Sequence, residues 1–216
     1  MNAFYFESLQ SNSSADFETF YQIYQQSIDP REQKPKAEIS KLIERSDYRI
    51  LLLKKTGTVM GFSIVYLNPD CKIGLLEYMA IIESARSRGL GGRLLKKAFE
   101  SLKTEGDFRF GVIEVDTPDL NGPDSDIKQR RVSFYRRHGC FTIDQLQYIL
   151  PLPGAGAPPK MNLMIYSVDP HDVISRKMLG KWLQTIYQKV YSCSPEDTRI
   201  FEMMNPMSDP IQIRKI

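Results

Sequence analysis

The chain has 216 residues, of which 42% are hydrophobic and 25% are charged, and its formal net charge is +3. These values are typical of a globular protein with one substantial core, and the length predicts one domain with an appended element. A net charge this small gives no reason to expect nucleic acid or an acidic membrane as a partner.

The cysteines and the apolar segments narrow the class further. Cys71, Cys140 and Cys193 are odd in number and far apart, which is typical of reduced thiols in a cytosolic protein and not of a metal site. The first residues lack the basic and apolar regions of a signal peptide, and no run of about 18 apolar residues exists to span a membrane. We therefore predict a cytoplasmic protein without a metal and without a membrane partner.

The N-terminal part of the chain predicts one strand and two helices. Residues 2–9 alternate weakly, as a short strand does. Ser13, Ser14 and Asp16 then precede a helical stripe formed by Phe17, Phe20, Tyr21 and Tyr24. Pro30 ends this helix, and a second helix is expected over residues 36–45.

Three consecutive apolar strands follow as an antiparallel meander. They are expected over residues 48–53, 59–67 and 73–82, with a hairpin turn at Lys54–Gly57 between the first two. The third strand runs into a polar turn rich in Arg and Gly, and a helix is expected from Leu94 to about Leu102.

The C-terminal part predicts further strands and helices in alternation. A strand at residues 110–115 leads through a loop at 116–126 to a basic helix at 127–138, which Gly139 ends as a C-terminal cap. A strand begins at Cys140, the Pro- and Gly-rich residues 148–160 exclude regular structure, and a strand follows at 161–168.

The last expected helix opens at Asp169, with Pro170 at its first helical position. An apolar stripe that includes Trp182 predicts that this helix packs in the core or forms a dimer contact. A homodimer is therefore possible from the sequence. We predict an α+β (mixed α/β) fold in three layers, with a mostly antiparallel twisted sheet and helices on both faces. The domain is expected to span residues 1–168, and residues 169–216 a C-terminal helical extension packed on it.

The turn between the meander and its helix, residues 77–95, has the chemistry of an anion site. Glycines let the main chain approach a phosphate, and the first N–H groups of a helix point toward it. The dinucleotide fingerprint would need a third glycine where Leu94 stands, and the nucleotide-triphosphate loop would need Lys-Ser/Thr after Gly92. Both classes also follow parallel strands, so the pattern left is Arg86-x-x-Gly89-x-Gly91. The competing interpretation is an arginine-rich solvated turn.

With this pattern the chain resembles the GNAT superfamily of acyl-CoA-dependent N-acyltransferases. The junction Phe134-Tyr-Arg-Arg-His-Gly-Cys-Phe141 is similar to the second conserved element of the family, Tyr-x-x-x-Gly-Phe, with Cys140 in the place of Phe. The strand between the two motifs and the order of elements also match, over about residues 17–168.

The resemblance implies a site for acetyl-CoA as co-substrate. Main-chain groups of Met79, Ala80 and Ile81 are expected to pair with the pantetheine arm. The pyrophosphate is expected at the amides of the turn, with Arg88 or Arg93 reaching the adenosine phosphate. The cofactor-binding residues of the turn are then Arg86, Ser87, Arg88, Gly89, Leu90, Gly91, Gly92 and Arg93.

Two catalytic roles follow from the chemistry of amide formation. Tyr135, which the resemblance places near the thioester sulfur, suits the acid that protonates the departing thiolate. Glu77 suits the base that removes a proton from the attacking amine, since four residues separate it from Ile81 and predict the same face of the strand. Glu114 and Glu32 are the other candidates for the base.

We therefore expect an N-acetyltransferase that acts on a small-molecule or peptide amine by direct attack in a ternary complex. The alternative is a non-catalytic acyl-CoA-binding regulatory protein. A nucleic-acid-binding module finds support only in the arginines of residues 130–137, without a known reader motif of such modules.

Overall fold

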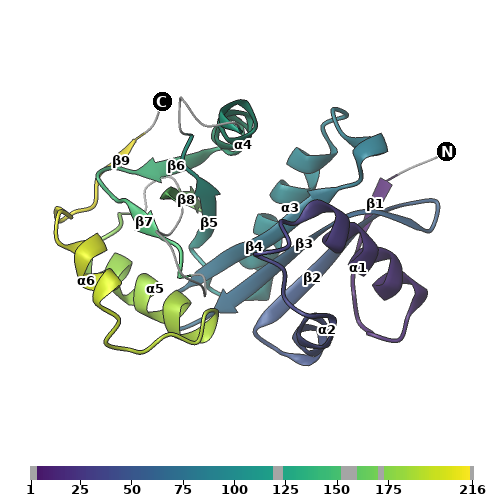
Figure 1. Cartoon of the computed structure of the whole chain (residues 1–216), viewed down its shortest axis with the longest axis horizontal. Helices are drawn as coiled ribbons and strands as arrows, with labels where there is room; N and C mark the ends of the chain where they lie inside the picture. Colours follow the sequence, from purple (N-terminus) through teal and green to yellow (C-terminus); the bar gives the residue numbers. More distant parts are fainter. Residues whose placement is uncertain (1–3, 119–123, 152–159, 170–172, 215–216) are drawn as a thin grey trace. The chain divides into compact units, whose positions relative to one another are not determined.

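The computed structural model describes residues 4–118, 124–151, 160–169 and 173–214 (Figure 1). The expected loop residues 119–123 and 152–159 and the expected helix start at 170–172 lie outside the described residues. Two compact units divide the chain: Met1–Asn68 with Gly74–Gly106, and Pro69–Ile73 with Asp107–Ile216.

The first unit has the predicted order of elements. They are β1 (Phe4–Ser8), α1 (Ala15–Ser27), α2 (Lys36–Glu44), β2 (Tyr48–Lys55), β3 (Thr58–Asn68), β4 (Ile73–Ile81), the 3-10 helix η1 (Glu83–Ala85) and α3 (Leu90–Glu105). Strands β1, β2 and β3 pair antiparallel, and β4 lies beside β3. The N-terminal end of α1 is capped by Ser14, whose side chain accepts from the amide of Phe17 at 3.2 Å.

Helices cover both faces of the sheet of the first unit. Alternate residues of β2 point to opposite faces, so their contacts show which helix lies on each face. Leu52 is paired with Phe62 of β3, whose ring lies 4.8 Å from that of Phe20 in α1. Leu53 instead packs in a cluster with Leu94 of α3. The helices α1 and α3 therefore lie on opposite faces, as Figure 1 shows.

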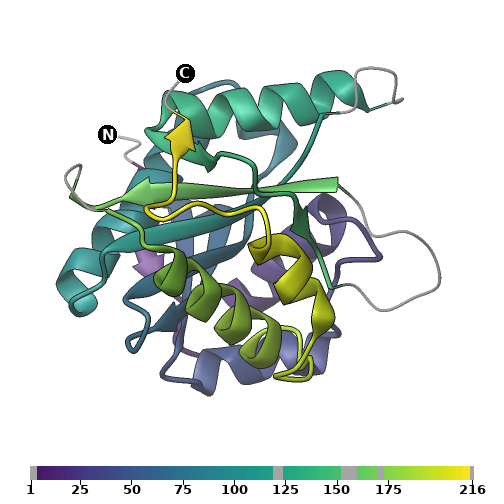
Figure 2. The same ribbon diagram turned by 90° about the vertical axis from the view of Figure 1, so that its left-hand side faces the viewer.

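The second unit is built around one long strand. Its elements are β5 (Phe110–Asp116), α4 (Ser125–Arg137), β6 (Cys140–Ile143), β7 (Tyr148–Ile149), β8 (Lys160–Ser167), α5 (Arg176–Lys189), α6 (Thr198–Met204) and β9 (Ile213–Arg214). Strand β8 pairs antiparallel with β5, β6 and β7, and β6 pairs with β9. Figure 2 shows α4 and α5 on opposite sides of β8. Trp182 of α5 is 1% exposed and lies 5.0 Å from the ring of Phe110, so its stripe belongs to the core.

Three expectations about elements were wrong. Helix α3 begins at Leu90 and not at Leu94, because Gly89 already provides the left-handed turn that starts it. Helix α5 begins at Arg176, where the side chain of Ser175 and not Asp169 caps it. Part of the segment expected to be irregular forms β7. After α5, where no further element was named, the chain forms α6 and β9. None of the described helices is long and apolar enough to cross a membrane.

Candidate active site

The turn between β4 and α3 presents unpaired amides. Ser87 and Gly89 have φ values of 61° and 71°, so the main chain turns twice through the left-handed region. Gly89 is the N-cap residue of α3, and no described side chain caps this helix end. Because the first helical N–H groups have no partner inside the helix, the amides of residues 90–92 are donors for a ligand.

The charges around this helix end favour an anion. Arg86, Arg88 and Arg93 are exposed, and the first turn of α3 carries no acidic residue. Arg86 donates from Nε to the carbonyl of Ile81 at 3.1 Å, which fixes the turn against the end of β4. The guanidinium of Arg93 lies 6.0 Å from the ring of Phe4. A phosphate at the amides would thus meet positive charge and no carboxylate of the first turn of α3.

The predicted pantetheine segment lies at the end of β4, against β3. Ala80 and Ile81 are buried, and Met79 is partly buried. A Cβ atom on Gly61 of β3 would lie 2.5 Å from Cδ1 of Ile81 and 2.6 Å from the carbonyl oxygen of Ala80. Only glycine permits this approach, so Gly61 sets the position of this part of β4.

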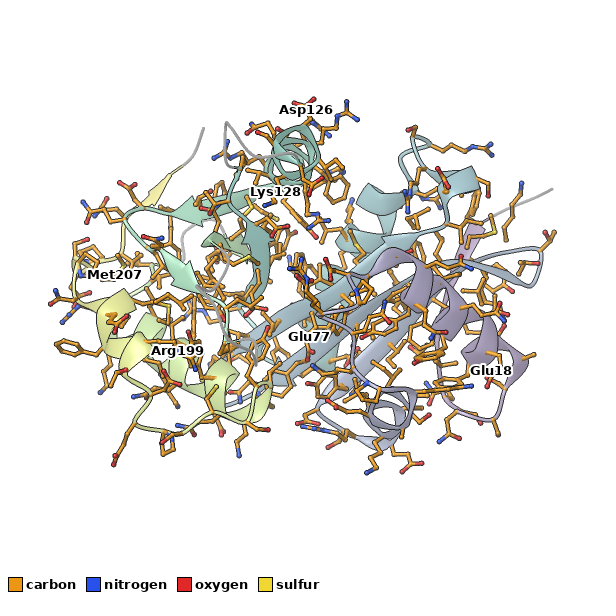
Figure 3. All side chains as sticks on the ribbon, viewed as in Figure 1. Glu18, Glu77, Asp126, Lys128, Arg199 and Met207 are labelled. Carbon is orange, nitrogen blue, oxygen red and sulfur yellow. The ribbon has the colours of Figure 1, made fainter. Side chains whose placement is uncertain are left out.

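Glu77 of β4, which is labelled in Figure 3, has a buried carboxylate that contacts Tyr48 and Lys34. Its side chain is 3% exposed. Tyr48 of β2 donates its hydroxyl to Oε1 at 2.5 Å, and Nζ of Lys34 lies 3.0 Å from Oε2. Burial acts to lower the pKa of Lys34, but the charge and hydrogen bond of Glu77 outweigh it, so the pKa is raised. Burial, followed by the charge of Glu77, raises the pKa of Tyr48.

Glu77 and Ile81 do not share a face of β4, and the expectation that they do was wrong. Glu77 meets Tyr48, whereas Ile81 packs in the cluster with Leu53 and Leu94, on the face covered by α3. Glu77 and the next residue, Tyr78, both contact the loop between α1 and α2. The strict alternation of side chains is therefore interrupted here, as in a β-bulge.

The loop between α1 and α2 is held by one tyrosine of α1 and one tyrosine of β4. Tyr24 of α1 accepts from the amide of Lys34 at 2.7 Å, and Tyr78 donates to the carbonyl of Glu32 at 2.8 Å. Gln33 donates to the carbonyls of Gln25 and Ile28 at 3.0 and 2.7 Å. These bonds hold the main chain of the loop in place. Glu32 itself is exposed.

Tyr135 lies on α4 in the second unit and is buried, with 8% of its surface exposed. Burial raises the pKa of its phenol to about 12. The charge of Arg131 acts to lower this pKa, and that of Cys140 acts to raise it. The helix ends as predicted, since Gly139 follows it with a φ of 83° and its amide donates to the carbonyl of Arg136 at 3.0 Å.

Glu114 of β5 is also held by tyrosines, within the second unit. Tyr148 of β7 donates its hydroxyl to Oε1, and Tyr191, which follows α5, donates to Oε2 at 2.5 Å. Burial, followed by the charge of Glu114, raises the pKa of Tyr148. The segment after α5 is thereby bonded to a carboxylate of β5.

The predicted residues are distributed over the two units. Glu77, the residues 79–81 and the turn 86–93 lie on one continuous stretch of the first unit, and Tyr135 and Glu114 belong to the second. Sequence reasoning missed the partners of both carboxylates. They are Lys34, Tyr48, Tyr148 and Tyr191. The only sequence signal for any of them was the Pro-bounded loop that contains Lys34.

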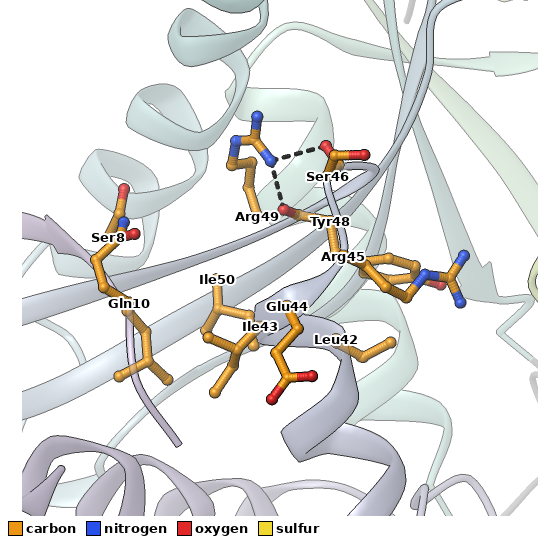
Figure 4. Close-up of a pocket in the computed structure, with 11 residues that line it drawn as sticks. Ser8, Gln10, Leu42, Ile43, Glu44, Arg45, Ser46, Tyr48, Arg49 and Ile50 are labelled. Carbon is orange, nitrogen blue, oxygen red and sulfur yellow. Dashed lines mark hydrogen bonds between the residues drawn. The ribbon is translucent and has the colours of Figure 1, made fainter. Parts of the chain in front are cut away.

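A cavity of about 400 Å³ in the first unit contains none of the predicted residues (Figure 4). It lies between β1, β2 and the end of α2. Arg45 and Arg49 line it, but Arg45 is paired with Asp47 at 2.7 Å and Arg49 with Glu105 at 2.5 Å. Since both guanidinium groups have carboxylate partners, this cavity does not compete with the turn as an anion site.

Comparison with known proteins identifies the family. The model of the acetyltransferase (GNAT) family matches residues 16–139, which is more than half of the chain. The match includes β4, the turn, α3, β5 and α4 with Gly139. No curated protein sequence matches the chain.

Solved structures share the fold at low sequence identity. A GNAT-family protein from Bacteroides thetaiotaomicron is 20% identical, with a TM-score of 0.71 over 88% of this chain and 99% of that one. A GNAT acetyltransferase from Elizabethkingia anophelis with acetyl-CoA bound is 16% identical, with a TM-score of 0.54 over 76% and 98%. An aminoglycoside 6'-N-acetyltransferase complexed with coenzyme A is 14% identical, with a TM-score of 0.60 over 78% and 99%.

Proposed function

The chain belongs to the acetyltransferase (GNAT) family, and on that premise we propose that it transfers an acetyl group from acetyl-CoA to a primary amine by direct attack in a ternary complex. The observation that carries the proposal is the turn before α3. It combines a helix end without a side-chain cap, a left-handed Gly89 and three exposed arginines, which suit a pyrophosphate.

Each predicted cofactor residue has a role in this proposal. The amides of Leu90, Gly91 and Gly92 bind the pyrophosphate, and Arg88 and Arg93 provide the charges nearest to it. Arg86 holds the turn by its bond to Ile81. The main chain of residues 79–81, set by Gly61, aligns the pantetheine arm. Bound acetyl-CoA supplies an acetyl group activated as a thioester, which an uncharged amine attacks.

Two side chains move the protons. An alkylammonium group has a pKa of about 10.4 and must lose a proton before it attacks. Glu77 takes this proton at one of its carboxylate oxygens, which Tyr48 and Lys34 contact in the structure. The new C–N bond forms as the C–S bond breaks, and Tyr135, whose raised pKa keeps it protonated, gives its proton to the sulfur. The nitrogen then loses its second proton, which returns through solvent to the Tyr135 phenolate, and Glu77 releases its proton to solvent.

The acceptor is a primary amine, small or part of a peptide. Among the structures of similar fold are the aminoglycoside acetyltransferase and a chimera of spermidine N-acetyltransferase, whose TM-score is 0.59 at 12% identity. Likeness at this level shows the fold alone, so the acceptor class needs an argument from the residues of this chain.

Thiol release from acetyl-CoA tests the proposal. We expect release that depends on an added primary amine, and loss of a general acid in Tyr135→Phe should lower turnover by about 10²–10⁴-fold while acetyl-CoA still binds. Tyr5→Phe, a change at a tyrosine that is 40% exposed, is the control. Unchanged turnover in Tyr135→Phe would show that this phenol is not the acid. Binding of acetyl-CoA without release for any amine would favour the non-catalytic acyl-CoA-binding protein.

A further inference from the structure

We propose that Lys34 occupies the place at Glu77 that the ammonium group of the acceptor takes, so that the acceptors of this protein are alkylammonium compounds and not arylamines. The inference rests on the proposed function, because it concerns the amine that this function acetylates. It makes Lys34 a specificity-determining residue.

The contacts of Glu77 leave an acceptor no direct access to it. Tyr48 bonds one carboxylate oxygen at 2.5 Å, and the ammonium of Lys34 lies 3.0 Å from the other. The carboxylate side chain is only 3% exposed. An acceptor can therefore reach Glu77 only if one of these two partners moves away.

Lys34 is the partner that can move. Tyr48 is 4% exposed, and its ring lies 4.7 Å from the guanidinium of Arg45 and 5.4 Å from the ring of Tyr66. The side chain of Lys34 is 13% exposed and ends a flexible four-carbon stem in a loop. Its main-chain amide is held by Tyr24 through a separate bond, so the ammonium can leave while the loop stays in place.

Charge then decides which amine can replace Lys34. A buried carboxylate that loses its ion-pair partner is strongly unfavourable, so the group that displaces Lys34 must bring a positive charge and N–H donors. A protonated alkylamine brings both, whereas an arylamine is uncharged at neutral pH and brings no charge. The arriving ammonium first gives a proton to Glu77, and the neutral amine then attacks the thioester. Lys34 keeps its own proton and is not consumed.

Steady-state kinetics with butylamine, spermidine and aniline test the inference in three variants. Lys34→Met removes the competing ammonium, and if Lys34 occupies Glu77 about nine-tenths of the time, KM for butylamine should fall about tenfold with little change in kcat. Lys34→Arg retains the charge and adds a forked donor that binds carboxylates more tightly, so KM should rise. The matched control is Lys36→Met, since Lys36 is 46% exposed and lies 2.8 Å from Glu18.

The Arg variant keeps the test decisive if the Met variant fails to fold. The inference is supported by opposite shifts in KM, or by a rise in the Arg variant alone, together with poor use of aniline by the wild type. It is overturned if KM for butylamine stays within the range of the control, if aniline is used as well as butylamine, or if mass spectrometry finds the acetyl group on Lys34 itself. Absence of thiol release with every amine would refute the proposed function, whereas release with unchanged KM refutes only this inference.

Discussion

Replacing Tyr48 by Phe removes one hydroxyl group from the partners of Glu77 and leaves the packing of the ring intact. The hydroxyl lies 2.5 Å from the carboxylate, and because the Glu77 side chain is 3% exposed, water cannot take its place. A hydrogen bond to a charged group contributes about 1.5–3 kcal/mol, so the free energy of unfolding should fall by about 2 kcal/mol.

Urea unfolding at neutral pH, followed by circular dichroism, measures this difference. The slope of the free energy against urea should be the same in both proteins, since the buried area does not change. Tyr5→Phe is the control, because this tyrosine is 40% exposed and its change should stay within about 0.5 kcal/mol. A loss below about 0.5 kcal/mol in Tyr48→Phe would refute the view that Glu77 depends on this bond.

The pH dependence gives an independent check with a definite sign. The folded protein raises the pKa of Tyr48 above its unfolded value of about 10. The stabilisation from the protonated phenol is therefore complete below pH about 10 and is lost as the pH rises further, because the unfolded chain then releases a proton that the folded one keeps. Above pH about 10 the wild type should lose stability with a steeper slope than Tyr48→Phe, and equal slopes would contradict the assignment.

Three further predictions concern the turn, the end of β4 and the β5 carboxylate. Gly89→Ala should cost about 1–2 kcal/mol of stability, because an L-residue is strained at a φ of 71°, and it should weaken acetyl-CoA binding in calorimetry. Gly61→Ala should cost about 1–3 kcal/mol in urea unfolding, because its Cβ would lie 2.6 Å from a carbonyl oxygen of β4. Tyr191→Phe should lower stability, and a double-mutant cycle with Glu114→Gln should give a coupling of at least about 1 kcal/mol.

The chain offers a control for each of these three. Gly57 has a φ of 84° and open space around it. Gly57→Ala should therefore cost the same stability as Gly89→Ala but leave acetyl-CoA binding unchanged. Gly180 lies inside α5, and a Cβ atom added there would lie 3.7 Å from the side chain of Met204, an ordinary contact distance. Gly180→Ala should stabilise the protein by up to about 1 kcal/mol. A cycle that pairs Tyr5→Phe with Glu114→Gln should show no coupling. An equal loss of acetyl-CoA binding in Gly57→Ala and Gly89→Ala would contradict the role of Gly89. For the other two residues, an effect equal to that of the control would contradict the role given to the residue.

The fold followed from the sequence wherever local signals decide structure. Ser14 caps α1 and Gly139 ends α4 as expected, because caps depend on residues within one turn. The start of α5 was misplaced because Asp169-Pro170 carries the same local signals as Ser175, and only tertiary packing selects between them. Periodicity could not reveal the irregularity at Glu77, since one interrupted step reverses the face of every later residue.

The candidate site was predictable only in its continuous part. The turn and its helix are adjacent in the chain, so glycines and arginines indicated them directly. The partners of the carboxylates are distant in sequence. Glu77 lies 29 positions after Tyr48, and Tyr191 lies 77 positions after Glu114. No pattern in a single sequence links such residues, because their contact arises from strand pairing and helix packing.

Thermal unfolding with acetyl-CoA tests the central claim most directly, because it requires no knowledge of the acceptor. At a concentration 100 times its dissociation constant, a ligand that binds only the folded protein adds about 2.7 kcal/mol of stability. We predict that acetyl-CoA and CoA both raise the melting temperature of the wild type and raise that of Gly89→Ala much less. A melting temperature that neither CoA species changes would contradict the account.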